Sequence, residues 1–244
     1  MRRLSAIVLV ALAGFGAALA HAQQRYAVIS LIGDRMQIAY AKGVPGQPVD
    51  SIERRYVPLE DSRIDRYTLL AANDTLKKLS KGPDPVLLQA FERSYFDTSA
   101  GTGALIEWIR QLVKDAKPKV THAILITKLE YEGVPALQKP FVGGNLLEGV
   151  GFFLGREAPP EGADPNSAGP GFLVPYAYFK ITLVDLATGK VVREEKGMAS
   201  SMLSATGTDT GNPWDTLNGG QKLQTLIDLV KKELEIQMPK VLAK

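Results

Sequence analysis

The sequence predicts an α+β or three-layer α/β fold: a mixed sheet with helices packed on it and a long Gly/Pro-rich insertion. Two observations predict this fold. Apolar runs typical of strands alternate along the chain with segments in which apolar residues recur every three or four positions, as in amphipathic helices. The composition, 45% hydrophobic and 23% charged, is that of a globular protein. The simplest division of the 244 residues is a leader over 1–22 and a single domain over 23–244, with the insertion at about 132–172.

Residues 1–22 have the pattern of a secretory signal peptide. Arg2 and Arg3 precede an uncharged apolar run, and Ala20-His21-Ala22 provides the small residues that signal peptidase recognises. The apolar run is shorter than the roughly 20 residues of a membrane-spanning helix. We therefore expect cleavage before Gln23, a periplasmic or secreted bacterial protein, and no transmembrane segment in the mature chain.

The composition excludes several kinds of chemistry. The chain has no Cys, which rules out disulfides, thiolate zinc sites and cysteine nucleophiles. Of its two His, only His122 follows the leader; it starts a predicted buried strand, and we interpret it as a structural residue. No serine lies in a Gly-x-Ser-x-Gly motif. We therefore expect no metal or other cofactor and identify no catalytic set.

The charges indicate no nucleic-acid partner. The leader holds two Arg and no acidic residue, so its removal lowers the formal net charge from +3 to +1. No dense basic patch is interleaved with aromatic residues. We interpret one cluster of charges as a solvated mixed-charge face rather than an acid–base pair. This cluster consists of Glu60, Asp61, Asp65, Arg54, Arg55, Arg63 and Arg66.

The first elements expected are strands. Residues 26–33 and 35–40 are β-type runs, and Gly33-Asp34 between them suits a two-residue turn, which predicts a β-hairpin. Residues 43–62 hold several prolines and glycines and are expected to be loop or edge structure.

Three helices are expected next. Apolar spacing predicts one over 67–79. Asp84-Pro85 predicts the start of a second, because Asp is a good N-cap and Pro suits the first helical position. The third covers 102–116, and Trp108 is expected to be buried on its apolar face. That face consists of Leu105, Trp108, Ile109, Leu112 and Ala116.

The C-terminal part of the chain returns to strands. Residues 120–130 are a continuous aliphatic and β-branched run, typical of a strand covered on both faces. Residues 176–186 and 190–200 flank the turn signal Asp185-Leu-Ala-Thr-Gly189, which predicts a β-hairpin. A final amphipathic helix is expected over 222–236, ended by Met238-Pro239.

The insertion contains an apolar, glycine-rich segment, 141–155, for which two interpretations stay open. It is a mobile flap that binds a partner, a ligand or a membrane surface, or it is a β-hairpin or covering loop whose Phe152, Phe153 and Leu154 pack on the sheet. The polar loop 205–220 around Trp214 is a second candidate for binding. The candidate binding residues are Phe141, Leu146, Leu147, Phe152, Phe153 and Trp214.

A strand-turn-strand segment carries a resemblance to known domains. It reads Phe179-Lys-Ile-Thr-Leu-Val-Asp-Leu-Ala-Thr-Gly-Lys-Val-Val192, with a predicted helix and strand before it and a helix after it. It resembles secreted bacterial domains of the curli-secretion-channel and penicillin-binding-protein-activator type, and the chain is also similar to an uncharacterised family of secreted proteobacterial proteins. The first resemblance implies an envelope accessory or assembly domain without catalysis. The chain departs from it in having no lipoprotein Cys.

These observations lead to one functional hypothesis and two alternatives. The leading hypothesis is a periplasmic, non-catalytic accessory or binding protein of the cell envelope. Its partner would be an envelope protein or a small ligand. The alternatives are a secreted hydrolase that uses carboxylates or serine, with 141–155 as a lid, and a structural envelope protein.

Overall fold

The computed structural model describes residues 24–42, 51–59, 62–79, 82–90, 102–115, 119–137, 146–156, 171–204 and 212–243. The predicted signal peptide lies outside these residues. Within them the chain forms a nine-stranded mixed sheet, a two-stranded sheet and three α-helices, so the predicted α+β class is confirmed. The strands are β1 (Tyr26–Leu31), β2 (Arg35–Lys42), β3 (Ser51–Pro58), β4 (Val86–Gln89), β5 (His122–Lys128), β6 (Glu130–Tyr131), β7 (Leu147–Glu148), β8 (Val150–Arg156), β9 (Gly171–Asp185), β10 (Lys190–Ser200) and β11 (Leu203–Ser204). The helices are α1 (Arg63–Leu79), α2 (Thr102–Leu112) and α3 (Gly219–Leu242), with the short 3-10 helices η3 (Pro135–Leu137) and η4 (Pro213–Thr216).

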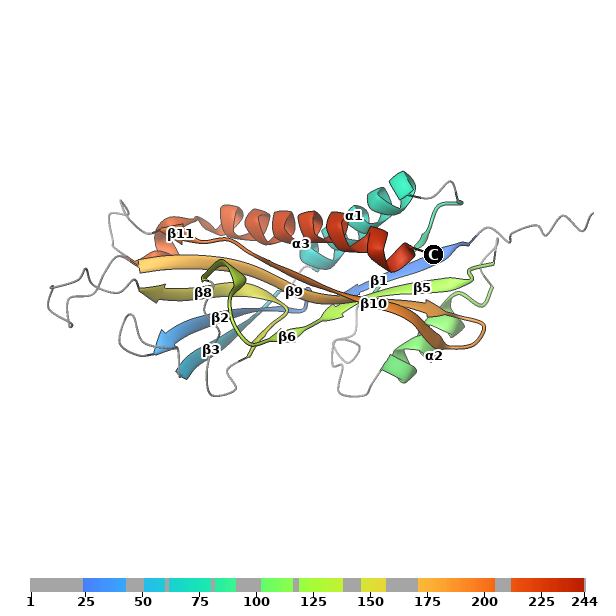
Figure 1. Ribbon diagram of the computed structural model, residues 1–244, viewed down its shortest axis with the longest axis horizontal. Coiled ribbons are helices and arrows are strands. Elements are labelled where there is room, and N and C mark those ends of the chain that lie inside the picture. Colours follow the sequence, from blue (N-terminus) through green and yellow to red (C-terminus); the bar gives the residue numbers. More distant parts are fainter. Residues whose placement is uncertain are drawn as a thin grey trace, which may run out of the picture.

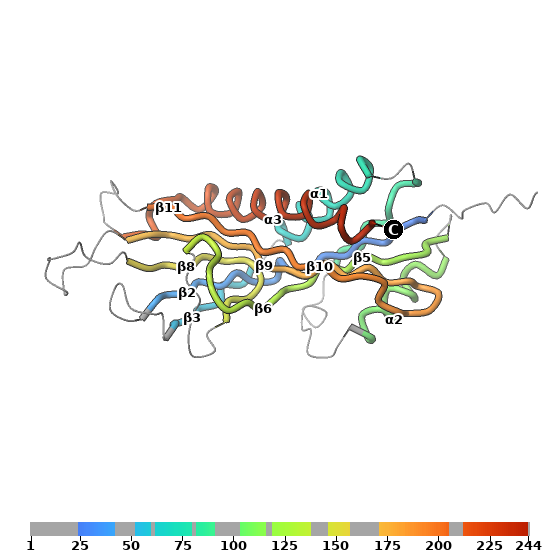
Figure 2. Tube along the Cα trace, viewed as in Figure 1, coloured from blue at the N-terminus to red at the C-terminus, as the bar shows by residue number. Residues whose placement is uncertain are grey.

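One long strand, β9, organises the sheet (Figure 1, Figure 2). On one side, β5 pairs antiparallel with its C-terminal half and β8 with its N-terminal half. Beyond them β1 runs parallel to β5, β2 runs parallel to β8, and β4 and β3 lie outermost. On the other side β9 pairs with β10 and β11. The sheet therefore has two halves that share β9.

The predicted hairpin between residues 26–33 and 35–40 is wrong. Both strands exist, but β1 and β2 follow one another in the same direction and belong to different halves of the sheet. The reason lies outside the local sequence. The Asp65 carboxylate on α1 accepts hydrogen bonds from the backbone N–H groups of Ile32 and Gly33, so these groups do not form the ladder of a tight turn. The chain bends here and continues forward.

The two faces of the sheet are covered differently (Figure 1). α1 and α3 pack on one face, over apolar side chains from both halves. On the opposite face α2 covers the half built from β1 and β5. Residues 129–137, together with Leu147, cover the half built from β2 and β8. Residues 123–126 of β5 are fully buried between these layers, as predicted for a strand covered on both faces.

The helix predicted to begin at Asp84-Pro85 is wrong, because the segment is the edge strand β4. Residues 86–89 pair in parallel with 27–30 of β1. A helix at this place would leave the outer backbone groups of β1 without this ladder, and backbone pairing outweighs a local capping signal.

The C-terminal helix α3 is longer than the sequence predicts. α3 does not end at Met238-Pro239 but continues through Pro239 to Leu242. A proline inside a helix costs about 3 kcal/mol, which burial of Met238 and Val241 in the core offsets.

The face that α2 turns to the sheet overlaps only in part with the one expected: Ile109 is buried as predicted, and Leu105 and Trp108 pack against the core while only partly buried. Ile106, Ile109 and Val113 are buried, whereas Trp108 is half-buried and Leu112 is 51% exposed. The apolar pattern of this helix is wide enough to allow two orientations, and packing against β1 and β5 selects the one centred on Ile109.

The region expected to be an insertion supplies a central strand. β8 pairs with β2 on one side and β9 on the other, and Phe152, Phe153 and Leu154 pack in the sheet as the second interpretation of this segment expects.

Candidate functional site

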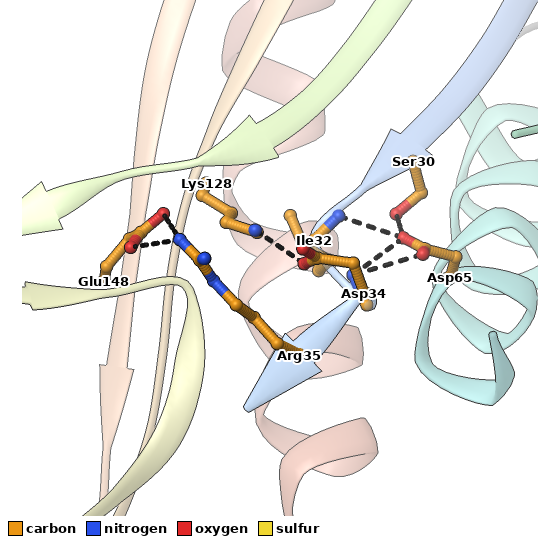
Figure 3. Close-up of polar contacts among 8 residues, drawn as sticks. Ser30, Ile32, Asp34, Arg35, Asp65, Lys128 and Glu148 are labelled. Atoms are coloured by element: carbon orange, nitrogen blue, oxygen red, sulfur yellow. Dashed lines mark hydrogen bonds and ion pairs between the residues drawn. The ribbon is translucent and has the colours of Figure 1, made fainter. Parts of the chain in front are cut away.

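Charged and polar side chains gather where the sheet changes from one half to the other. The chain leaves β1 and enters β2 at residues 32–34, and it leaves β5 and enters β8 across residues 129–149. The bend at residues 32–34 and the end of β5 lie side by side, and α1 contributes a third group, Asp65 (Figure 3). This polar centre is the candidate site. It contains Ser30, Asp34, Arg35, Gln37, Asp65, Lys128 and Glu148.

Asp65 is the buried end of the polar centre. Its side chain is at the start of α1 and only 2% of the residue is exposed. Oδ1 accepts hydrogen bonds from Ser30 Oγ at 2.5 Å and from Ile32 N at 3.0 Å, and Oδ2 accepts one from Gly33 N at 3.1 Å. Burial raises the pKa of Asp65 to about 6, although these three donors act against the rise. The sequence predicts that the Asp65 carboxylate is solvated, and this prediction is wrong.

Gly33 is required by this arrangement. A Cβ at this position would lie 2.7 Å from Oδ2 of Asp65 and 2.9 Å from its backbone nitrogen. Such a contact is too close for any side chain, so the docking of α1 onto the bend demands glycine here.

A buried ion pair links the end of β5 to the bend between β1 and β2. Lys128, the last residue of β5, places Nζ 2.5 Å from Oδ1 of Asp34. The two side chains are 5% and 15% exposed. The pair therefore ties the end of β5 to the bend between β1 and β2, in surroundings where an isolated charge is costly.

The outer end of the polar centre reaches the surface through Arg35. Its Nη2 lies 3.1 and 3.4 Å from the two carboxylate oxygens of Glu148, and its guanidinium lies 4.4 Å from the centroid of the Tyr56 ring. Gln37 joins this group to the core: Oε1 accepts from Tyr176 Oη at 2.6 Å, and Nε2 donates to Tyr56 Oη at 3.1 Å. Arg35 and Tyr56 are 41% and 43% exposed.

The geometry of the polar centre suits holding and recognition more than proton transfer. Asp34, Asp65 and Glu148 each already contact a donor, and Asp65, whose pKa is raised by burial, is sealed from solvent. Among the described residues no three side chains of His, Asp or Glu are grouped as metal ligands. His122 lies apart, with Nδ1 2.9 Å from Thr121 Oγ1 and its ring beside Tyr26.

The residues predicted for binding occupy different places. Phe141 lies outside the described residues and Leu146 is half-buried, whereas Leu147, Phe152 and Phe153 are fully buried. Half-buried Trp214 stands edge-on to Phe152 at 5.5 Å, under Nζ of Lys222 at 4.3 Å. Phe153 and Leu147 lie in the opposite face of the sheet with Tyr176. Their role in partner binding stays a prediction, while their packing role is plain.

Sequence reasoning missed Arg35, Tyr56 and Glu148. A local signal existed for one part: Asp34 and Arg35 are adjacent opposite charges directly after an apolar run. The partners Lys128 and Glu148 are about a hundred residues away, and no local pattern connects them.

A scan against protein-family models finds no match, and neither does a search of curated proteins. A search of solved structures finds similarity to several proteins, among them a Helicobacter pylori protein described as a neuraminyllactose-binding hemagglutinin homolog, with 9% identity, a TM-score of 0.41, and coverage of 91% of this chain and 84% of that one. PelC from Paraburkholderia phytofirmans has 12% identity, a TM-score of 0.30, and coverage of 87% and 89%. A Xanthomonas campestris protein of family DUF330 has 10% identity, a TM-score of 0.33, and coverage of 89% and 88%.

No helix in the described part of the chain is long and apolar enough to cross a membrane.

Proposed function

We propose that this chain is a non-catalytic binding protein of the bacterial cell envelope, exported by the leader 1–22. One observation carries the proposal. The polar centre uses its carboxylates for internal contacts, while its outer end presents Arg35 and Tyr56 on the surface beside Arg54 of the edge strand. Arginine and tyrosine are among the residues enriched at protein-binding surfaces, because they combine apolar area with hydrogen-bonding groups.

The arrangement of β8 gives less support to a hydrolase with a lid. A lid must move away from the site that it covers. Residues 150–156 pair with β9, residues 151–154 also pair with β2, and Phe152 and Phe153 are fully buried. Lifting this strand would break two ladders and expose two aromatic side chains.

Export is tested by cell fractionation followed by N-terminal sequencing. The protein should be recovered from the periplasm or medium with Gln23 first. Full-length chain in the inner membrane would contradict export.

Binding is tested by in-cell photo-crosslinking. A photoreactive phenylalanine analogue is placed, one at a time, at three exposed positions: Tyr56 on β3, Leu70 on α1 and Leu112 on α2. A discrete adduct at any of these positions supports a binding protein. The absence of an adduct at all three, in a protein that is folded and exported, would overturn the proposal.

A further inference from the structure

We propose that the edge strand β3 is a docking strand, onto which an extended acidic segment of a partner protein adds as a further strand of the sheet. This inference rests on the proposed binding function and names the chemistry of the partner.

The edge at β3 is open. β3 is eight residues long and, among the described strands, pairs with β2 alone. It forms the margin of the sheet farthest from α3 (Figure 1). Residues 53–56 and Pro58 are exposed. A strand of this kind offers a row of backbone donors and acceptors to an added strand.

The other described edges are shorter or protected. β4 has four residues. The edge at β10 lies under α3: Met198 N donates a hydrogen bond to Oε1 of Glu233 at 3.3 Å, and the Arg193 guanidinium donates to the carbonyl of Lys240 at 2.8 Å. A glutamate that accepts from the edge backbone blocks the approach of another strand. The contrast with β3 makes β3 the edge that is left for a partner.

The side chains at the open edge select an acidic partner. Arg54 lies opposite Ala39 and Tyr56 opposite Gln37, so both point to the face that carries Arg35. The charge of Arg54 lowers the pKa of buried Tyr176, against the rise that burial causes, which agrees with this orientation. Arg55 points to the other face. Within the described residues, neither Arg54 nor Arg55 forms an ion pair or hydrogen bond.

An added strand with acidic residues would place them beside these arginines. Opposite charges directly across a strand pair stabilise the pair, and backbone pairing supplies the remaining attraction. A second copy of this chain gains less from charge than an acidic segment does. Antiparallel pairing of two β3 strands centred on Glu53 or Arg55 would set identical charges opposite each other. Pairing centred on Arg54 would set Glu53 opposite Arg55 twice, but it would also set Arg54 opposite itself.

The test uses the mature chain and a fluorescent octapeptide of alternating glutamate and threonine. Fluorescence anisotropy should show saturable binding that weakens with added salt. Hydrogen exchange of residues 51–58 should slow when the peptide is bound. The same peptide with lysine in place of glutamate should not bind, and one with alternate backbone nitrogens methylated should bind at least tenfold more weakly, because it lacks the donors of a strand.

Charge reversal at Arg54 tests whether the peptide binds at β3. Arg54→Glu should weaken peptide binding about tenfold, since it replaces an attraction with a repulsion, while Arg54→Lys should retain it. Arg66→Glu is the matched control, because Arg66 is an exposed arginine on α1. All three variants should keep the wild-type urea midpoint, as exposed substitutions usually do.

Three results would overturn the inference: equal binding by Arg54→Glu, equal binding of the methylated peptide, or no slowing of exchange in β3. If photo-crosslinking finds a partner at Leu70 or Leu112 while the peptide fails, the docking strand is wrong and the binding function stands. If no position crosslinks, the proposed binding function is itself wrong.

Discussion

Asp65 is the residue that most directly fixes the bend between β1 and β2. We expect Asp65→Asn to destabilise the protein by about 1–3 kcal/mol, because an amide nitrogen would face a backbone donor and leave it unpaired. Asp74→Asn, an exposed acid on the same helix, is the matched control and should change little. Urea unfolding measures both. Equal midpoints for the two variants would show that the contacts to Ile32 and Gly33 do not determine the bend.

The same carboxyl makes stability depend on pH. Burial raises its pKa from 3.8 to about 6 in the folded protein. Between these values the folded state binds more protons than the unfolded state, so this group lowers stability as the pH rises from 4 to 6. The free-energy gap between wild type and Asp65→Asn should therefore widen by up to about 3 kcal/mol from pH 7 to pH 4. A gap that does not change across this range would contradict the raised pKa.

The two ion pairs of the polar centre should differ in energy because their burial differs. Lys128→Met leaves Asp34 buried without its partner and should cost about 3–5 kcal/mol, and the additional substitution Asp34→Ala should recover part of the loss. Arg35→Gln should cost about 1 kcal/mol or less, since the pair with Glu148 is half-exposed. Denaturant unfolding of the four proteins measures the difference. A Lys128→Met variant as stable as Arg35→Gln would show that the inner pair is solvated.

At the scale of elements, the sequence predicts what is decided locally. The hairpin of β9 and β10 was predictable because its turn is self-contained: Asp185 accepts hydrogen bonds from the backbone of Ala187 and Thr188, and Gly189 takes a φ of +71°. The segment Gly33-Asp34 has a similar appearance, yet Asp65, some thirty residues later, accepts its backbone donors and prevents the turn. The sequence therefore predicts the pairing of β9 with β10 correctly and the pairing of β1 with β2 wrongly.

The candidate site shows the same limit. Its members come from β1, β2, α1, β5 and β7, and they meet because β1 and β2 follow each other in one direction. A prediction that pairs β1 with β2 does not place β2 beside β8, the pairing that brings Arg35 near Glu148. The apolar residues of β8 stand out in the sequence, but an apolar run interrupted by glycine is equally typical of a binding flap and of a central strand.

The orientation of α2 offers a test with a matched pair. Ile109 is fully buried and Leu112, less than one turn away, is 51% exposed. Ile109→Ala should cost about 2–5 kcal/mol, and Leu112→Ala about 0.5 kcal/mol, by thermal or denaturant unfolding. A cost for Leu112→Ala as large as that for Ile109→Ala would place both residues on the buried face, as the sequence predicts.

The whole molecule depends on elements that cross from one half of the sheet to the other. β9 pairs with strands of both halves along its 15 residues. The core under α1 and α3 is also continuous: Val28 and Ile124 belong to one half, and Phe152 and Leu173 to the other. Neither half can lose its structure without exposing part of this shared core, so the two halves are coupled energetically.

We therefore expect the halves to unfold together, and the chain provides a probe in each. Its two tryptophans are Trp108, which packs against the core under α2, and Trp214, which contacts Phe152 in the other half. The variants Trp108→Phe and Trp214→Phe each leave one reporter. Chains of this size often unfold through intermediates, and coincident transitions are the test of all-or-none unfolding. In each variant, tryptophan fluorescence and far-ultraviolet circular dichroism should give the same urea midpoint. If Trp214 fluorescence changes at a lower urea concentration than circular dichroism, the half built on β2 and β8 opens separately, and the shared strand does not couple the two.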